Sequence, residues 1–247
     1  RAGVDLSWRP TPNLQLTATV NPDFGAVESD DVVVNLTAFE TFFPEKRLFF
    51  LEGTEVFVTS PRSNPRTGGT GPSGSGARRA PSLFTIEPTT LLNTRRIGGS
   101  AKQVEVPDGI DVAGVELSKP SELVGAAKLV GQAGNIRYGV LTAFEKDPTL
   151  DGTDVATGAP VEITADGRDF HVARVLYETS GQGRKAIGYM GTAAMNPTYD
   201  AFVHGIDTHF LSANGAWTWD TQLMASDKEG VDGYGMFTDI NYTPRTG

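Results

Sequence analysis

The feature that most constrains this chain is a regular alternation of apolar and polar residues along its second half. In residues 134–145 the chain presents two interleaved sets of side chains. The first set is mostly apolar or aromatic: Ile136, Tyr138, Val140, Thr142 and Phe144. The second set is charged, small or aliphatic: Arg137, Gly139, Leu141, Ala143 and Glu145. Successive side chains of a β-strand point to opposite faces, so this spacing predicts a strand with one apolar-aromatic face.

Strand-like segments of this kind follow one another along the chain. Near the start we expect strands at Val4–Trp8 and Leu14–Val20. Further on we expect strands at 123–131, 134–145, 169–179, 184–195, 199–212, 215–227 and 231–242. Most of the later ones are joined by short links with Gly, Asn or Asp, which are hairpin signals, and a longer polar link spans 146–168. This order predicts an antiparallel meander with tight turns on one side and extended loops on the other.

The alternation fits two all-β architectures, a soluble sandwich or barrel and an outer-membrane-type β-barrel. The segments run to roughly 10–12 residues, against about 5–6 in globular strands and about 9–11 for a tilted bilayer crossing. Aromatic residues also lie toward the predicted strand ends: Tyr138, Phe144, Tyr177, Trp217, Trp219, Tyr234 and Tyr242. Both features favour the membrane barrel, in which such residues form interfacial girdles.

Composition excludes several classes of protein. The chain carries 30 acidic and 21 basic residues, for a formal net charge of −9, and no basic face emerges for nucleic acid. Its lack of cysteine removes disulfides, thiolate metal sites and cysteine nucleophiles. No apolar run approaches the roughly 20 residues of a membrane helix.

We divide the chain into three zones. Residues 1–58 hold the N-terminal strands and an aromatic plug-like segment, and residues 59–82 read as a flexible Gly/Pro/Ser loop. Residues 83–247 supply the barrel strands. We expect an incomplete barrel, whose closure needs further strands or other chains.

Several blocks of this sequence resemble a bacterial family known by a domain-of-unknown-function label, DUF5916. They are Thr11-Pro12-Asn13-Leu14, Thr19–Gly25, Val33–Thr37, Phe39–Arg47, Phe49–Gly53 and Arg95-Arg96-Ile97-Gly98. Their order and the hairpins behind them also agree with the family. The resemblance implies a bacterial outer-membrane barrel, often preceded by a module similar to carbohydrate-binding family 9, which does not occur in this sequence.

The best candidate for a specific role is the segment Phe43–Gly53, in which charges alternate with aromatic residues. We expect it to fold inward, with Glu45, Lys46, Arg47 and Glu52 pairing with charges of the barrel wall, as a structural plug or as an element that narrows the pore.

Other charged residues are candidates for lining the lumen. Arg95 and Arg96 either bind an anionic group bidentately or offset acidic residues of the lumen. We also place Arg137, Arg174 and Asp220 on the lumen face.

Metal and catalytic signals are weak. A Ca²⁺ site at Asp23, with Glu28, Asp30 and Asp31, lacks the EF-hand spacing. Asp207 and His209 share one strand face at i and i+2, without a third ligand placed by spacing. No catalytic motif is recognisable, so we expect no enzyme and no cofactor.

These observations predict an outer-membrane protein that moves a solute across a bacterial envelope or displays material there. The family resemblance alone implies a carbohydrate as the solute. The expected partners are outer-membrane lipid and other envelope proteins or glycans, with no nucleic acid. A non-conducting binding or scaffold module is the alternative, and a carbohydrate-active enzyme is a third one.

Overall fold

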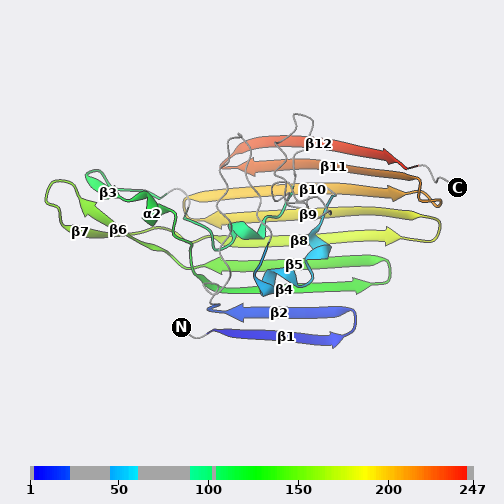
Figure 1. The fold of residues 1–247 in the computed structure, drawn as a ribbon, viewed down its shortest axis with the longest axis horizontal. Helices are drawn as coiled ribbons and strands as arrows, with labels where there is room; N and C mark the ends of the chain where they lie inside the picture. Colours follow the sequence, from blue (N-terminus) through cyan, green and yellow to red (C-terminus); the bar gives the residue numbers. More distant parts are fainter. Residues whose placement is uncertain (1–2, 23–44, 61–89, 102–103, 244–247) are drawn as a thin grey trace, which may run out of the picture.

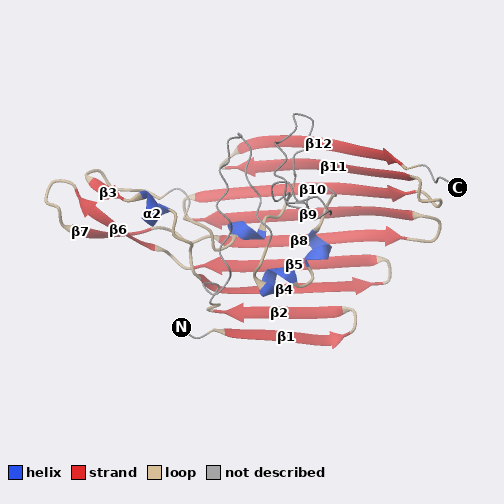
Figure 2. Cartoon of the chain, in the orientation of Figure 1, coloured by secondary structure: helices blue, strands red, loops and turns tan. Residues whose placement is uncertain are grey.

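The fold is dominated by one large antiparallel β-sheet (Figure 1, Figure 2). The computed structural model describes residues 3–22, 45–60, 90–101 and 104–243. The sheet has nine strands in the order β1-β2-β4-β5-β8-β9-β10-β11-β12. Their bounds are β1 Val4–Thr11, β2 Leu14–Val20, β4 Leu123–Ala133, β5 Ile136–Glu145, β8 Asp169–Thr179, β9 Arg184–Asn196, β10 Tyr199–Leu211, β11 Trp217–Lys228 and β12 Val231–Tyr242. The prediction of an all-β antiparallel sheet of long strands is therefore confirmed.

The sheet is open at both edges in the described part of the chain. Each neighbouring pair of strands is antiparallel, and β1 and β12 pair on one side only. The closure of the predicted barrel therefore stays a prediction. The sequence places the strands within a few residues of their observed bounds because alternation ends where the turn residues begin.

The tight turns are not confined to one side of the sheet. Two long excursions, at 21–122 and 146–168, leave from one end, but that end also carries the short turns at 197–198 and 229–230. At 229–230, Glu229 and Gly230 both have positive φ (54° and 76°), as a two-residue hairpin turn with the right twist requires. The expected division into a tight side and an extended side is wrong for these two turns.

The long link at 146–168 contains structure that its polar sequence conceals. It forms the hairpin of β6 (Thr149–Asp154) and β7 (Pro160–Thr164), which joins β3 (Ile110–Val112) in a three-stranded sheet beside a short helix, α2 (Gly114–Leu117). Leu150 and Ile163 are paired across the hairpin and both buried. Strands this short, with Leu150 in one and Val161 and Ile163 in the other, are too brief to show a periodic pattern, so the sequence reads as a loop. Figure 1 shows this small sheet beyond one end of the large one.

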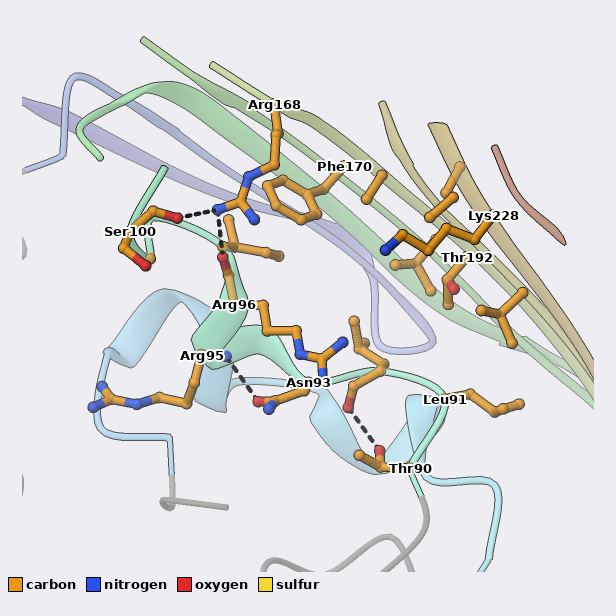
Figure 3. A pocket seen from close by; sticks show the side chains of 18 residues that line it. Thr90, Leu91, Asn93, Arg95, Arg96, Ser100, Arg168, Phe170, Thr192 and Lys228 are labelled. Carbon is orange, nitrogen blue, oxygen red and sulfur yellow. Dashed lines mark hydrogen bonds between the residues drawn. The ribbon is translucent and has the colours of Figure 1, made fainter. Parts of the chain in front are cut away.

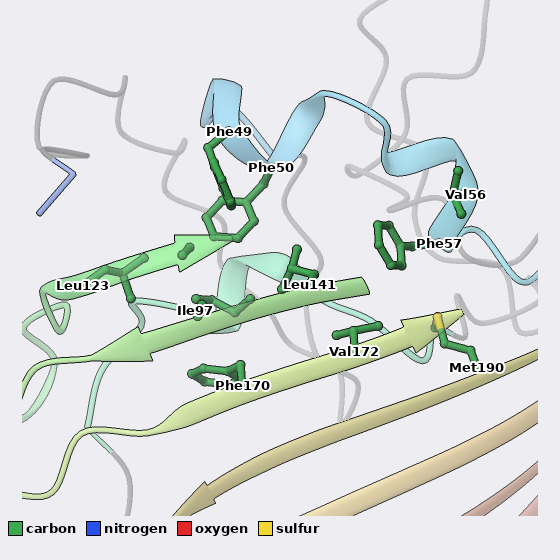
Figure 4. Close-up of a cluster of buried hydrophobic side chains, with 12 residues drawn as sticks. Phe49, Phe50, Val56, Phe57, Ile97, Leu123, Leu141, Phe170, Val172 and Met190 are labelled. Carbon is green, nitrogen blue, oxygen red and sulfur yellow. The ribbon is translucent and has the colours of Figure 1, made fainter. Parts of the chain in front are cut away.

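Short helical segments cover one face of the large sheet, which we call the inner face (Figure 1). These are α1 (Leu48–Leu51), the 3₁₀ turn η1 (Thr54–Phe57) and the 3₁₀ turn η3 (Thr94–Arg96). Phe50 of α1 and Ile97, the residue after η3, pack with Leu141 and Met190 of the sheet in a buried cluster (Figure 4). The described core therefore lies between the inner face and residues 45–60 and 90–101, which we call the covering segments.

The opposite face, called here the outer face, is apolar and exposed. Its side chains come from the apolar rows that the sequence predicts, and Leu223 and Tyr234 remain 47% and 82% exposed. The exposed apolar set on the strands includes Leu6, Trp8, Val140, Phe144, Val175, Tyr177, Ile187, Ile206, Phe210, Trp217, Trp219, Met236, Ile240 and Tyr242. The polarity is inverted relative to a soluble sheet, since the charged side chains Lys128, Arg174 and Asp207 are the buried ones.

Candidate functional site

The inner face holds its covering segment 45–60 through side chains that reach up from the strands. Lys128 of β4 donates from Nζ to the backbone carbonyls of Phe49 and Glu52, at the end of α1. Its side chain is buried, and its Nζ lies 5.1 Å from the centre of the Phe49 ring. A buried ammonium needs such partners because burial without them costs several kcal/mol, about the scale of a whole domain's stability.

Arg174 of β8 forms the centre of a buried ion-pair network. Its Nη1 donates to Oδ1 of Asp207 on β10, and its Nη2 donates to Oδ2 of the same carboxylate at 2.7 Å. Both side chains are fully buried. Its Nε also donates to the carbonyl of Val56 in the covering segment at 3.3 Å. One guanidinium therefore joins two strands to the segment that crosses them.

The network continues through His209 toward the next strand. Its Nε2 lies 2.8 Å from Asp207 Oδ2, and its Nδ1 lies 2.6 Å from Asp220 Oδ1 on β11. Both ring nitrogens face carboxylate oxygens, and only the protonated imidazole can donate from both. The geometry therefore fits a cationic His209 between two carboxylates.

A further link ties the end of the covering segment to β11. Gln222 donates from Nε2 to Thr59 Oγ1 at 2.9 Å, and Gln222 is fully buried. Thr59 and Ser60, the first two residues of the predicted flexible loop, are buried too, so the packed segment extends past the boundary drawn from sequence. The remainder of that loop, 61–82, lies outside the described residues.

Glu45 and Arg47 hold the two covering segments together. Arg47 donates to Glu45 from Nε and Nη2 at 2.8 and 2.7 Å, and to the carbonyls of Thr94 and Ile97 at 2.6 Å each. Burial by itself would raise the pKa of Glu45, but the hydrogen bonds and charge of Arg47 outweigh it and lower that pKa below its ordinary value. The pair thus acts between the covering segments: Glu45 and Arg47, which we expected to pair with charges of the barrel wall, pair with each other.

A second ion pair fixes residues 90–101 to the sheet. Glu145 accepts from Arg168 Nε and Nη2 at 3.0 Å each, and from the backbone nitrogen of Gly98 at 2.8 Å. Gly98 has φ +73°, a backbone conformation that a residue with a Cβ rarely adopts. Arg168 also donates to the carbonyls of Arg96 and Ser100. These contacts place η3 above the inner face.

A cavity of about 710 Å³ lies between η3 and the inner face of β8 to β11 (Figure 3). Its sheet side includes Phe170, Val172 and Thr192, and its other side includes Leu91 and Arg96. Four basic residues line it, and no aspartate or glutamate is among its described lining residues: the basic ones are Arg95, Arg96, Arg168 and Lys228.

The structure brings most of the predicted lumen residues to the inner side. Arg174 and Asp220 lie in the buried network, and Arg95 and Arg96 line the cavity. Two further predicted lumen residues, Arg137 and Glu52, form ion pairs elsewhere on the sheet. Arg137 pairs with Glu178 at 3.0 Å, and Glu52 pairs with Arg9 of β1 at 2.6 Å.

The two weak metal predictions meet different outcomes. Asp207 and His209 do lie together, but each is engaged in the ion-pair network described above. Within the described ranges, no group of three or more His, Cys, Asp or Glu side chains is arranged to hold a metal ion. Asp23, Glu28, Asp30 and Asp31 lie outside the described residues.

Sequence reasoning missed Lys128 and the glycines that make room beneath the covering segments. A Cβ on Gly139 would lie 2.8 Å from the Phe57 ring, and one on Gly188 would meet the guanidinium of Arg174 within 2.5 Å. Two signals were available in the sequence. One is Lys128, the single charged residue in a strand of mostly small and aliphatic residues, and the other is the presence of glycines in the polar rows of the strands. Neither signal identifies a partner that lies about 80 residues away in the chain, as Phe49 does from Lys128 (|i−j| = 79).

Fold and site together define an all-β protein in which one large sheet packs its inner face, with its buried ion pairs and apolar core, against inserted segments and leaves its apolar outer face exposed. Comparison with known families then places the N-terminal part more closely. A model of the family described as "Domain of unknown function (DUF5916)" matches residues 1–104, so this part of the chain is similar to that family. The match spans the Phe39–Gly53 block and Arg95–Gly98, and it confirms the resemblance. No curated protein and no solved structure matches the chain.

The described helices are all short. None of them has the length and apolar character to cross a bilayer.

Proposed function

We propose that this chain forms part of the wall of a β-barrel in a bacterial outer membrane and serves solute passage or surface display there. The observation that carries the proposal is the inverted polarity of the sheet. Large apolar side chains cover the exposed outer face, whereas ion pairs such as Arg174–Asp207 lie buried on the inner face. Soluble monomers rarely expose apolar surface of such extent, and lipid is the solvent in which it is favourable.

Strand length and aromatic placement support the same proposal. Seven strands of the large sheet, β4, β5 and β8 to β12, are each 10–13 residues long, which suits a tilted crossing of about 9–11 residues. Several outer-face aromatics gather toward one end of the sheet, where Trp217 and Tyr242 pack with ring centroids 4.5 Å apart. Tyr and Trp rings prefer the boundary between lipid and water.

A substitution on the outer face tests the proposal. Leu223 lies at the middle of β11, so Leu223→Arg places a charge where we expect the bilayer centre, at a cost of about 2–4 kcal/mol. The variant should lose insertion into liposomes and heat-modifiable gel mobility. Its matched control is Val20→Arg at the end of β2, an exposed outer-face position at the sheet end, where we expect a cost of about 0–1 kcal/mol. A Leu223→Arg protein that inserts like the wild type, or that becomes a stable water-soluble monomer, contradicts the proposal.

A second candidate is a non-conducting scaffold, and the covering segment 45–60 is the observation that favours it. This segment crosses the inner face from β4 to β11 through Lys128, Arg174 and Gln222. Conductance in planar bilayers separates the two candidates. A pore narrowed by the segment should conduct more after residues 45–60 are replaced by a Gly/Ser linker, whereas a scaffold should stay silent in both forms.

A further inference from the structure

Charged side chains divide the outer face of the large sheet into two different ends. Strand register places Asp169, Asp200, Asp227 and Asp232 on this face, near the end where β8 and β12 begin, and all four are exposed. Lys185 is the one lysine or arginine that register places on this face in the nine described strands. It lies near the opposite end, where β9 begins (Figure 1). The outer face is therefore acidic at one end and basic at the other.

The row that contains Lys185 is rich in aromatic rings. Phe210 is the direct partner of Lys185 across β9 and β10, and of Trp219 across β10 and β11. Beyond this row, Trp217 and Tyr242 pack against each other at the same end of the sheet. Lysine, tryptophan and tyrosine side chains favour the headgroup level of a bilayer, because each has an apolar body and a polar tip. This part of the outer face, which we call the Lys185 end, thus has the composition of a membrane interface.

The spacing between the two ends matches the apolar thickness of an outer-membrane barrel. On β10, Asp200 lies ten positions from Phe210, the partner of Lys185, and on β12 the same spacing separates Asp232 from Tyr242. Ten residues of strand span about 33 Å, which is roughly 25 Å along the membrane normal at a tilt of about 40°. The apolar band of such barrels is about 25 Å tall. The acidic row and the Lys185 row therefore fall at the two edges of one bilayer.

Lys185 is available to a lipid headgroup. Its side chain is exposed, and in the part of the chain that the structure describes it takes part in no hydrogen bond or ion pair. The neighbouring Arg184 lies on the inner side, where it pairs with Glu178 at 2.8 Å. A flexible lysine stem lies along apolar surface and lets its ammonium extend to a phosphate, which it contacts as a point charge.

We propose that the Lys185 end lies in the headgroup layer of an anionic phospholipid leaflet, with the Lys185 ammonium on a lipid phosphate. The acidic end then lies at the other leaflet. The two ends are not interchangeable, because a row of aspartates repels anionic headgroups and a lysine attracts them. This assignment rests on the proposed membrane function and deepens it, since it fixes which end of the sheet faces which lipid surface.

Quenching of tryptophan fluorescence by brominated lipids tests the proposal. The three tryptophans of the chain are Trp8, Trp217 and Trp219, and all lie on the outer face toward the Lys185 end. Their quenching therefore reports the lipids around that end. The full chain is placed in phosphatidylcholine vesicles that contain a minority of brominated phosphatidylglycerol or, as reference, of brominated phosphatidylcholine. We expect stronger quenching by the phosphatidylglycerol, and a smaller difference between the two lipids when salt is added.

Charge-neutralising variants locate the contact. Lys185→Gln should reduce the relative affinity for phosphatidylglycerol about fivefold, as expected for the loss of one cation at a lipid surface. Lys146→Gln is the matched control, because Lys146 is an exposed lysine that follows β5 at the acidic end, and it should leave this relative affinity unchanged. Equal quenching by the two lipids in the wild type, or an unchanged preference in Lys185→Gln, overturns the proposal.

The same assay separates this proposal from the barrel proposal. Quenching by brominated phosphatidylcholine requires only that the outer face contact lipid. Absence of quenching by either lipid overturns both proposals. Quenching by both lipids to the same extent overturns only the placement of the Lys185 end and leaves the barrel proposal standing.

Discussion

Buried charge at single residues is the feature on which the inner face depends. Arg174 and Asp207 have no exposed side-chain surface, and removing Asp207 leaves the Arg174 guanidinium buried without its carboxylate. Such a pair contributes little relative to an apolar replacement of both partners, but breaking it by removing one partner is costly.

Asp207→Asn should therefore destabilise the protein by about 3–5 kcal/mol, because Arg174 stays buried without its carboxylate. The measurement is the free energy of unfolding in urea from lipid or detergent. Glu178→Gln is the matched control, since Glu178 pairs with the part-exposed Arg137 and Arg184, and it should cost at most about 1 kcal/mol. Equal losses in the two variants would show that the buried pair has no special role.

The pair of Glu45 and Arg47 predicts an effect of acid. The pKa of Glu45 is lowered below its ordinary value of 4.5, so the folded carboxyl binds a proton more weakly than the unfolded one. Its contribution to stability is present above pH 4.5 and is lost as the pH falls through the lowered pKa. Over that acidic range, amide hydrogen exchange of residues 45–60 should accelerate relative to the intrinsic exchange rate at each pH. In Glu45→Gln the exchange should already be fast at neutral pH and should lose this pH dependence; an unchanged profile would count against the pair.

At the scale of elements, glycines decide how closely the covering segments approach the sheet. Gly139 of β5 lies beneath Phe57 of η1, with no room for a Cβ between them. A larger residue at this position must displace a ring rather than the tip of a flexible side chain.

Gly139→Val should cost about 1–3 kcal/mol through overpacking and should loosen η1 from the sheet. Hydrogen exchange of residues 54–57 measures the loosening. Gly235→Val on β12 is the control, because its Cβ would meet only the mobile end of Met224, at 3.0 Å, and its effect on η1 should be negligible. Undisturbed exchange at η1 in Gly139→Val would mean that the segment adapts without strain.

At the scale of the whole molecule, strand parity limits how the sheet can close. Nine strands in antiparallel order leave β1 and β12 running in the same direction (Figure 1). Pairing these two directly would create a parallel junction, whereas bacterial single-chain barrels are antiparallel with an even number of strands. Closure of the proposed barrel therefore calls for an odd number of strands beyond these nine.

Engineered cysteines test this expectation, since the chain has none of its own. Leu223 and Met236 are direct partners on β11 and β12, so a Leu223→Cys and Met236→Cys pair should form a disulfide under oxidation. A Leu6→Cys and Met236→Cys pair, across the two edge strands, should not. A disulfide between the edge strands within one chain would refute the parity argument.

The sequence by itself determined the strands of the large sheet, their direction and the face to which each side chain belongs. This follows because alternation with a period of two is a local property, and a strand that keeps it has one apolar side wherever it is placed. It also predicted an inward fold for the Phe43–Gly53 segment, whose charges and rings suit neither a strand nor an exposed loop, and the described part of this segment, residues 45–53, does lie on the inner face.

Only the tertiary structure decided what each polar side chain contacts. Lys128 meets carbonyls 76 and 79 positions away, and Gln222 meets Thr59 across 163 positions. No local pattern encodes such pairings, because they depend on where the covering segments cross the sheet. The same holds for the β6–β7 hairpin, which packs Leu150 against Ile163, and for the basic cavity, whose walls come from distant parts of the chain.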